Sequence, residues 1–167
     1  MTSPEDRVRE LGLEIPDYAN PPYGGRYGGG LKAFHRIGAL VELSGLTPES
    51  RAGEQLHPGV VGADVSLDQA RAAARLTAVH SLGMIRYAIG SLDRVVALSR
   101  ALCFVLCAPG FDRLNEVSNA ATELYLDVFG PDVGSVGRAS IGAVSLTRSN
   151  CFELWLSLEC AADTPAR

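Results

Sequence analysis

The chain has one lysine, Lys32, among its 15 basic side chains, and all the other basic residues are arginines. These arginines form no run, and 19 acidic residues outnumber the basic ones, so the net charge is −4. Binding to nucleic acid depends on a basic patch that neutralises phosphates, and nucleic acid is therefore not an expected partner. Arginine can instead clamp the carboxylate of a small molecule with two parallel hydrogen bonds.

Long apolar runs are also missing. No stretch approaches the roughly 18 consecutive apolar residues of a membrane-spanning helix, and the first residues lack the apolar segment of a signal peptide. We therefore expect a cytoplasmic protein with no membrane partner. Cys103, Cys107, Cys151 and Cys160 form no C-x-x-C pair and have no histidine at metal-ligand spacing. We interpret them as free thiols in buried strands rather than as redox or metal groups.

A length of 167 residues suits one domain. Residues 1–30 differ from the rest because they contain four prolines and a glycine-rich stretch at 23–30. Phosphate-binding loops follow a strand and open a helix, whereas this stretch follows prolines and precedes a strand. It is interpreted as a surface arm, or as a lid formed with its tyrosines. The domain is assigned to residues 31–160, and residues 161–167 are expected to fray.

Two long helices are predicted, together with a short one over residues 5–11. Ser66 and Gln69 form a capping box, and apolar residues recur at spacings of three or four as far as Ile89, before Gly90. A second apolar stripe predicts a helix over residues 112–129, which Gly130-Pro131 should end. Residues 49–65 are interpreted as a loop.

The strand predictions cover residues 31–36, 39–43, 94–107, 138–146 and 151–159. In the last of these, apolar and polar residues alternate with period two. The resulting order, β-β-α-β-α-β-β, favours an α+β fold in which one mixed sheet has both helices on one face. Trp155 lies among polar residues on the other face, and a symmetric oligomer is one way to bury it.

Several short motifs occur together in this order of elements. They are ELGLEIP (10–16), LSG (43–45), VGADVS (61–66), AAARL (72–76), LDRVV (92–96), APGF (108–111), VSNAA (117–121) and GRASIG (137–142). With these motifs the chain resembles the Rid family, also called YjgF-like and historically endoribonuclease L-PSP, in its longer, divergent branch. The resemblance covers about residues 9–159.

This resemblance implies a fold also seen in one class of chorismate mutase, and a homotrimer with three clefts between subunits. Archetypal members hydrolyse reactive enamines and imines, such as 2-iminopropanoate and 2-iminobutanoate, to a 2-keto acid and ammonia. They use no metal or cofactor. The chain is therefore expected to be an imine deaminase, with a small-molecule imine, enamine or carboxylate as its ligand.

The resemblance also assigns roles to individual residues. Arg138 corresponds to the arginine that holds the substrate carboxylate. Glu153, fifteen residues later, corresponds to the acidic residue that positions the attacking water. Further cleft residues implied in this way, or considered beside them, are Asn119, Ser140, Ser44, Tyr27 and Cys107. Position alone favours a solvated arginine at a strand end for Arg138, and Glu153 could be an ordinary outward-facing strand residue.

Two departures from the family pattern leave the function open. The family usually has Leu-Pro after the penultimate strand, where this chain has Leu146-Thr147, and no tyrosine stands a dozen residues before Ser44. The alternatives are a pathway-specific enzyme that cyclises, dehydrates or tautomerises an imine, and a non-catalytic trimeric binder of small molecules. The historical ribonuclease activity is a further alternative, which the acidic charge disfavours.

Overall fold

The computed structural model describes residues 2–20 and 30–162, so Tyr27 and the glycine run before Gly30 lie outside the described residues. The elements are α1 (Pro4–Glu10), β1 (Phe34–Ile37), β2 (Leu40–Leu43), α2 (Leu67–Ile89), β3 (Val95–Leu106), α3 (Leu114–Gly134), β4 (Gly137–Ala143) and β5 (Phe152–Cys160). Short 3-10 turns stand at Leu92–Arg94 and Thr147–Ser149.

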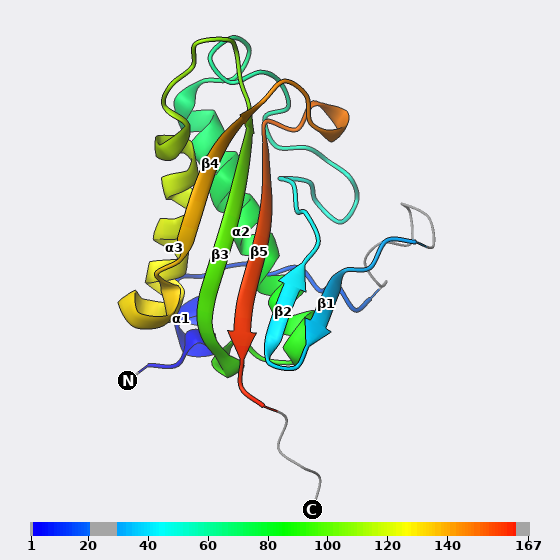
Figure 1. The fold of residues 1–167 in the computed structure, drawn as a ribbon, viewed down its shortest axis with the longest axis vertical. Coiled ribbons are helices and arrows are strands. Elements are labelled where there is room, and N and C mark those ends of the chain that lie inside the picture. The colour runs from blue at the N-terminus through cyan, green and yellow to red at the C-terminus, as the bar shows by residue number, and fades with distance from the viewer. Residues whose placement is uncertain (1, 21–29, 163–167) are drawn as a thin grey trace, which may run out of the picture.

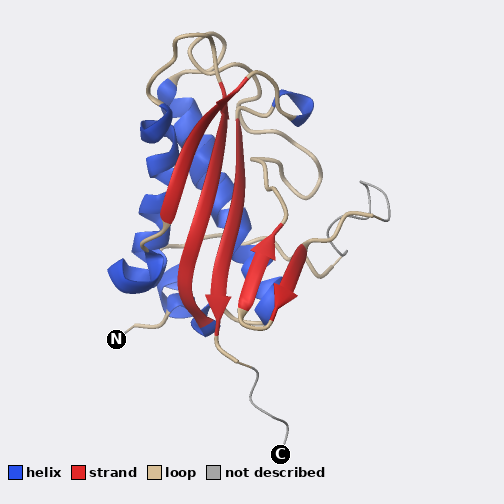
Figure 2. Ribbon diagram, viewed as in Figure 1, coloured by secondary structure: helices blue, strands red, loops and turns tan. Residues whose placement is uncertain are grey.

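The five strands form one sheet in the order β1-β2-β5-β3-β4. β3 and β4 run parallel, and the other neighbours run antiparallel. Figure 1 shows α2 and α3 side by side on one face of this sheet, with α1 near their lower end. In Figure 2 the opposite face of the sheet is turned to the viewer, and no described helix covers it. The predicted α+β fold is confirmed.

The long helix α2 begins and ends as its sequence predicts. The Ser66 side chain accepts from the Gln69 N–H at 3.2 Å, and the Gln69 side chain accepts from the Ser66 N–H at 2.9 Å. Gly90 takes the left-handed conformation, with φ of 85°, that ends the helix. Alanines on the buried side, including Ala70, Ala74 and Ala78, let the helix approach the sheet closely.

α3 begins two residues later than predicted and has an additional turn at its end. It spans Leu114–Gly134, and the predicted stop at Gly130-Pro131 falls where the helical conformation is interrupted. Gly130 does break the helix, with φ of 75° and ψ of 174°. Proline suits the first turn of a helix because its missing N–H has no partner there, so Pro131 starts a further helical turn.

The strand predictions are confirmed with shifted ends. The first hairpin turns at Gly38-Ala39, one residue later than expected, and β4 ends at Ala143 rather than at residue 146. The alternation of β5 is present, because Phe152, Leu154 and Leu156 are buried against the helices. Burying each of these side chains stabilises the fold by about 1.5–3 kcal/mol. No helix among the described residues has both the length and the apolarity to span a membrane.

Candidate functional site

Arg138 lies near the start of β4, and its side chain extends toward α3. Its Nη1 donates to Thr122 Oγ1 at 2.9 Å, and its Nη2 donates to Asn119 Oδ1 at 2.9 Å. Both acceptors stand on α3 three residues apart, so they lie on the same side of the helix. We call these three residues the arginine cluster. The structure thus joins Arg138 and Asn119, both of which the family resemblance indicated.

The arginine cluster carries an unneutralised positive charge. Among the described residues, no carboxylate forms an ion pair with Arg138. A guanidinium has five N–H donors in a planar fork, and only two of them donate to the neutral oxygens of Thr122 and Asn119. The remaining donors and the net charge suit an anionic ligand, above all a carboxylate.

Ser140 and Cys103 lie beside the arginine cluster on the same face of the sheet. Ser140 follows Arg138 by two residues along β4 and pairs with Cys103 on β3. Burial raises the pKa of the Cys103 thiol to about 11, although contacts with Ser118 and Arg138 oppose this. At neutral pH Cys103 is a neutral thiol, and a neutral thiol is a poor nucleophile.

Cys107 does not join this cluster. It follows the end of β3, and its sulfur packs next to Gly142, where an added Cβ would lie 3.1 Å from it. Arg138 pairs with Ala101 on β3, and Ala101 stands six residues before Cys107. At about 3.3 Å per residue, Cys107 is roughly 20 Å from Arg138 along the sheet.

Glu153 lies on β5, on the face that α2 and α3 leave uncovered. Its Oε1 accepts a hydrogen bond from Trp155 Nε1 at 2.7 Å. Glu153, Trp155, Ser44 and Gly45 are among the residues that line a cavity of 240 Å³, which we call the glutamate pocket. Because Trp155 occupies one oxygen and fixes the carboxylate, the other oxygen is left to accept a proton or to orient a water molecule.

A clamped loop forms another wall of the glutamate pocket. Asn150 Nδ2 donates to Glu49 Oε1 at 2.6 Å and to the Thr147 carbonyl at 2.9 Å, and Arg148 donates to the second Glu49 oxygen. Arg148 and Ser149 both have φ of 57°, which is uncommon for residues other than glycine. The clamp holds this strained turn, and with it Thr147, against the pocket.

The sheet separates the two candidate catalytic side chains within one chain. Arg138 pairs with Ala101, and Glu153 pairs with Phe104. Residues 101 and 104 are three apart on the same strand, so they and their partners face opposite sides of the sheet. Because β3 lies between β4 and β5, the Cα atoms of Arg138 and Glu153 are separated by two strand spacings and by three residues along the strand direction, on the order of 14 Å in all. Arg138 and Glu153 of a single chain therefore cannot bind one small substrate together.

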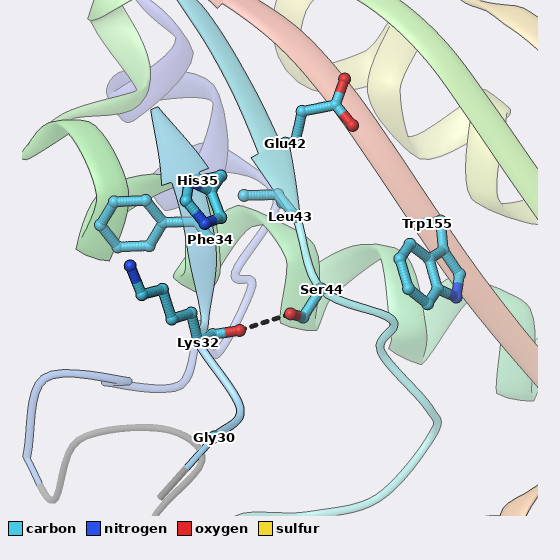
Figure 3. Close-up of a pocket in the computed structure, with 8 residues that line it drawn as sticks. All are labelled: Gly30, Lys32, Phe34, His35, Glu42, Leu43, Ser44 and Trp155. Carbon is cyan, nitrogen blue, oxygen red and sulfur yellow. Dashed lines mark hydrogen bonds between the residues drawn. The ribbon is translucent and has the colours of Figure 1, made fainter. Parts of the chain in front are cut away.

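A second cavity adjoins the glutamate pocket and shares Ser44 and Trp155 with it. We call this space of 330 Å³ the lysine pocket. Figure 3 shows Lys32 on one side of Ser44 and Trp155 on the other, with His35 above. The Ser44 hydroxyl donates to the Lys32 carbonyl, which fixes the segment before β1 against the end of β2.

Some of these residues were missed by the sequence reasoning, and one stays outside the structure. Thr122 stands one helical turn after Asn119, which is a spacing that the sequence displays. Trp155 and Lys32 come together with Ser44 only in the folded chain, so no local pattern indicated that the three residues line one cavity. Tyr27 lies outside the described residues. Within the described ranges, no group of His, Cys, Asp and Glu side chains could hold a metal ion.

Known proteins resemble this chain in sequence and in structure. No family model matches it. Protein TCP17 from Trypanosoma cruzi is 30% identical over 139 residues, which cover 83% of this chain and 82% of that protein. The crystal structure of protein Atu1372 from Agrobacterium tumefaciens, of unknown function, is 28% identical with a TM-score of 0.82, covering 95% of this chain and 94% of the other.

Two further solved structures have the same fold. A proposed endoribonuclease from Shewanella oneidensis MR-1 is 23% identical with a TM-score of 0.84, and the match covers 94% of this chain and 99% of that one. YyfA from Yersinia pestis, a protein of unknown function in the conserved Rid protein family, is 12% identical with a TM-score of 0.56, covering 79% and 89% of the two chains.

Proposed function

The chain belongs to the Rid family, the YjgF-like or endoribonuclease L-PSP proteins, and on this premise we propose that it hydrolyses reactive imines and enamines to a 2-keto acid and ammonia. The observation that carries the proposal is the arginine cluster. Two neutral side chains hold Arg138 by hydrogen bonds of 2.9 Å, and among the described residues no acidic side chain neutralises it. Such a group suits the carboxylate of a 2-imino acid.

The glutamate pocket supplies the carboxylate that activates the attacking water in this reaction. A water molecule held by Glu153 adds to the imine carbon, and Glu153 accepts a proton as the new C–O bond forms. That proton passes to nitrogen and gives a carbinolamine. Glu153 next accepts the proton of the new hydroxyl group and passes it to nitrogen, so that the C–N bond breaks, the keto group forms and ammonia leaves. A substrate that already reacts with water needs little more than this positioning, so a triad or a metal is not required.

We place each active site between two copies of the chain. The sheet separates Arg138 from Glu153 within one copy, and only a second copy can bring an arginine cluster to a glutamate pocket. This arrangement agrees with the trimer and the three intersubunit clefts that the family resemblance implies. The open face of the sheet, with Trp155 47% exposed, is a surface that such a neighbour would cover.

A pathway-specific reaction on another imine is the second candidate. Two observations favour it: the lysine pocket extends the glutamate pocket beyond what a three-carbon imine fills, and Thr147, where the family usually has proline, lines the glutamate pocket. The ribonuclease activity in the names of some relatives is less favoured, because a net charge of −4 disfavours RNA binding.

The test is a deamination assay with freshly made imines. An amino-acid oxidase generates a panel of 2-imino acids, and semicarbazide traps whatever the protein fails to hydrolyse. We expect the wild-type protein to reduce the trapped imine, and Arg138→Ala to lower kcat/KM by about 10- to 100-fold, since a hydrogen bond to a charged group contributes about 1.5–3 kcal/mol.

Arg75→Ala is the matched control. Arg75 forms an exposed ion pair with Asp127 at 3.8 Å on the helical side of the molecule, so its loss removes the same charge without touching either pocket. Full activity of Arg138→Ala, with wild-type stability, would contradict the assignment of the carboxylate clamp. A folded wild-type protein that accelerates the hydrolysis of no imine would favour the pathway-specific enzyme or the non-catalytic binder.

A further inference from the structure

The lysine pocket has the chemistry of a binding site for a second anionic group. Lys32 is exposed, and its ammonium forms no ion pair among the described residues. Glu42 also lines this cavity, but its carboxylate pairs with Arg100 at 3.8 Å. The negative charge of Glu42 is thus offset from outside the pocket, and the cavity keeps the positive charge of Lys32.

The lysine pocket adjoins the place where the reaction is proposed to occur. Both cavities are lined by Ser44 and Trp155, and Figure 3 shows the indole facing the space beside Ser44. Trp155 also holds Glu153 by a hydrogen bond of 2.7 Å. A substrate whose reacting carbon lies at Glu153 can therefore extend its side chain along the indole of Trp155 toward Lys32.

We propose that the preferred substrate is a dicarboxylic 2-imino acid whose side-chain carboxylate binds Lys32 in the lysine pocket. This inference rests on the proposed function, because it takes the reacting end of the substrate to lie at Glu153. The α-carboxylate binds Arg138 from the neighbouring copy, and Lys32 binds the far end. A single ammonium with one imidazole, from His35, matches one carboxylate, and the indole of Trp155 covers the methylenes between the two charges.

The single tryptophan of the chain offers a direct measurement of binding. Because Trp155 lines both pockets, a ligand that occupies either one should change its fluorescence. The probes are two 2-keto acids of equal length, 2-oxoglutarate and 2-oxopentanoate, which correspond to hydrolysis products and differ in the terminal carboxylate. We expect wild-type protein to bind 2-oxoglutarate about 10- to 100-fold more tightly, as one charge-assisted contact provides.

Substitutions at Lys32 test whether this residue causes the preference. Lys32→Met should remove the preference while leaving the affinity for 2-oxopentanoate unchanged, and Lys32→Arg should retain most of it. Arg75→Met removes the same charge at a distance and should leave the preference intact. Equal affinity of wild-type protein for both acids, no binding of either acid, or a preference that survives in Lys32→Met would overturn the inference.

The same variants separate this inference from the proposed function. Imine hydrolysis with no preference for the dicarboxylic acid would leave the function standing and overturn the role of Lys32. A Lys32-dependent preference for 2-oxoglutarate without hydrolysis of any imine would establish the binding site and refute the deaminase. In the hydrolysis assay, the imine derived from glutamate should be preferred over the imine derived from norvaline, as 2-oxoglutarate is preferred in the fluorescence measurement. Lys32→Met should lose this preference in both assays.

Discussion

Gly45 is the residue on which the geometry of the glutamate pocket most directly depends. An added Cβ at this position would overlap Glu153 Oε1 and lie 2.6 Å from Trp155 Nε1. The carboxylate and the indole therefore rest against the backbone at the end of β2, in space that any larger residue would occupy. The atoms in the way are the ends of two side chains, which can turn aside without moving the backbone.

Gly45→Ala should consequently impair activity far more than stability. We expect the free energy of unfolding to change by less than about 1 kcal/mol, as is usual outside the core. The displaced carboxylate should lower kcat by about 10- to 100-fold, because small misplacements of catalytic groups are costly. Thermal unfolding and the imine assay measure the two effects on the same sample.

A double substitution tests whether the loss acts through Glu153. In a Glu153→Gln background, Gly45→Ala should cause little further loss, since the carboxylate that it displaces is already gone. Additive losses in the double variant would show that Gly45 acts in another way, for example by altering Ser44, and would count against the geometry described above.

Individual site residues could be predicted only where a motif carries them. The family motifs indicated Arg138 and Asn119, and the fold joins the two by a hydrogen bond of 2.9 Å. Thr122 was missed although it stands one turn from Asn119. Trp155 was noted as a residue that needs partial burial on the second face, but its hydrogen bond to Glu153 could not be foreseen, because it depends on side-chain directions along β5.

At the level of elements, α1 is docked by one carboxylate rather than by a large apolar contact. Glu5 accepts from Arg86 Nε on α2 at 3.1 Å and from the Leu92 N–H at 2.9 Å. Val8 is the one buried residue of this helix. Burial by itself raises the pKa of Glu5, but the hydrogen bonds and the charge of Arg86 outweigh it, so the pKa lies below its usual value of 4.5.

The docking of α1 should therefore weaken in acid. A carboxyl group whose pKa is lower in the folded than in the unfolded state stabilises the fold above its unfolded pKa, and this stability is lost as the pH falls through the folded pKa. We expect Glu5→Gln to lower stability at pH 7 by about 1 kcal/mol, as for a partly exposed ion pair. The variant should also lose less stability than wild type between about pH 5 and 3.

Urea unfolding at several pH values measures this difference, and Glu10→Gln is the matched control. Glu10 lies on the same helix and pairs with Arg7 at 3.0 Å, with both side chains about half exposed. This pair is worth little, so the variant should follow the wild-type pH profile. Equal acid sensitivity of Glu5→Gln and wild type would mean that Glu5 does not anchor α1.

Regular elements were predictable where their signals are local. The capping box at Ser66 and the spacing of apolar residues gave α2 correctly, since a cap and a stripe are properties of adjacent turns. The break of α3 at Gly130 was predicted correctly, but the further turn after it was not, because Gly130-Pro131 is equally compatible with a stop and with a break followed by another turn. The faces on which Arg138 and Glu153 lie required the register of three strands.

At the level of the whole molecule, the open face of the sheet carries apolar side chains that a lone chain leaves in water. Ile37 is 67% exposed and pairs with Leu40, which is 38% exposed, and Trp155 lies on the same face. A face of this kind is typical of a surface that another protein covers. The shared active site proposed above requires that a neighbouring copy cover this face with its arginine cluster.

This arrangement makes a quantitative prediction for mixed oligomers. Arg138→Ala and Glu153→Gln should each keep only a small residual activity alone, because each removes one half of every site. When the two variants are refolded together in equal amounts, about a quarter of the interfaces should pair an intact arginine cluster with an intact glutamate pocket. We therefore expect about a quarter of the wild-type imine hydrolysis to return.

The control for mixing is a pair of differently tagged chains, whose co-purification reports how many oligomers contain both variants. If Arg138 and Glu153 acted within one chain, every chain in the mixture would carry a defect, and no activity could return at any ratio. Inactivity of verified mixed oligomers would therefore contradict the shared site, and a stable monomer in light scattering would do so more directly. Recovery that follows the product of the two variant fractions, highest at equal amounts, is expected only of a site assembled from two copies.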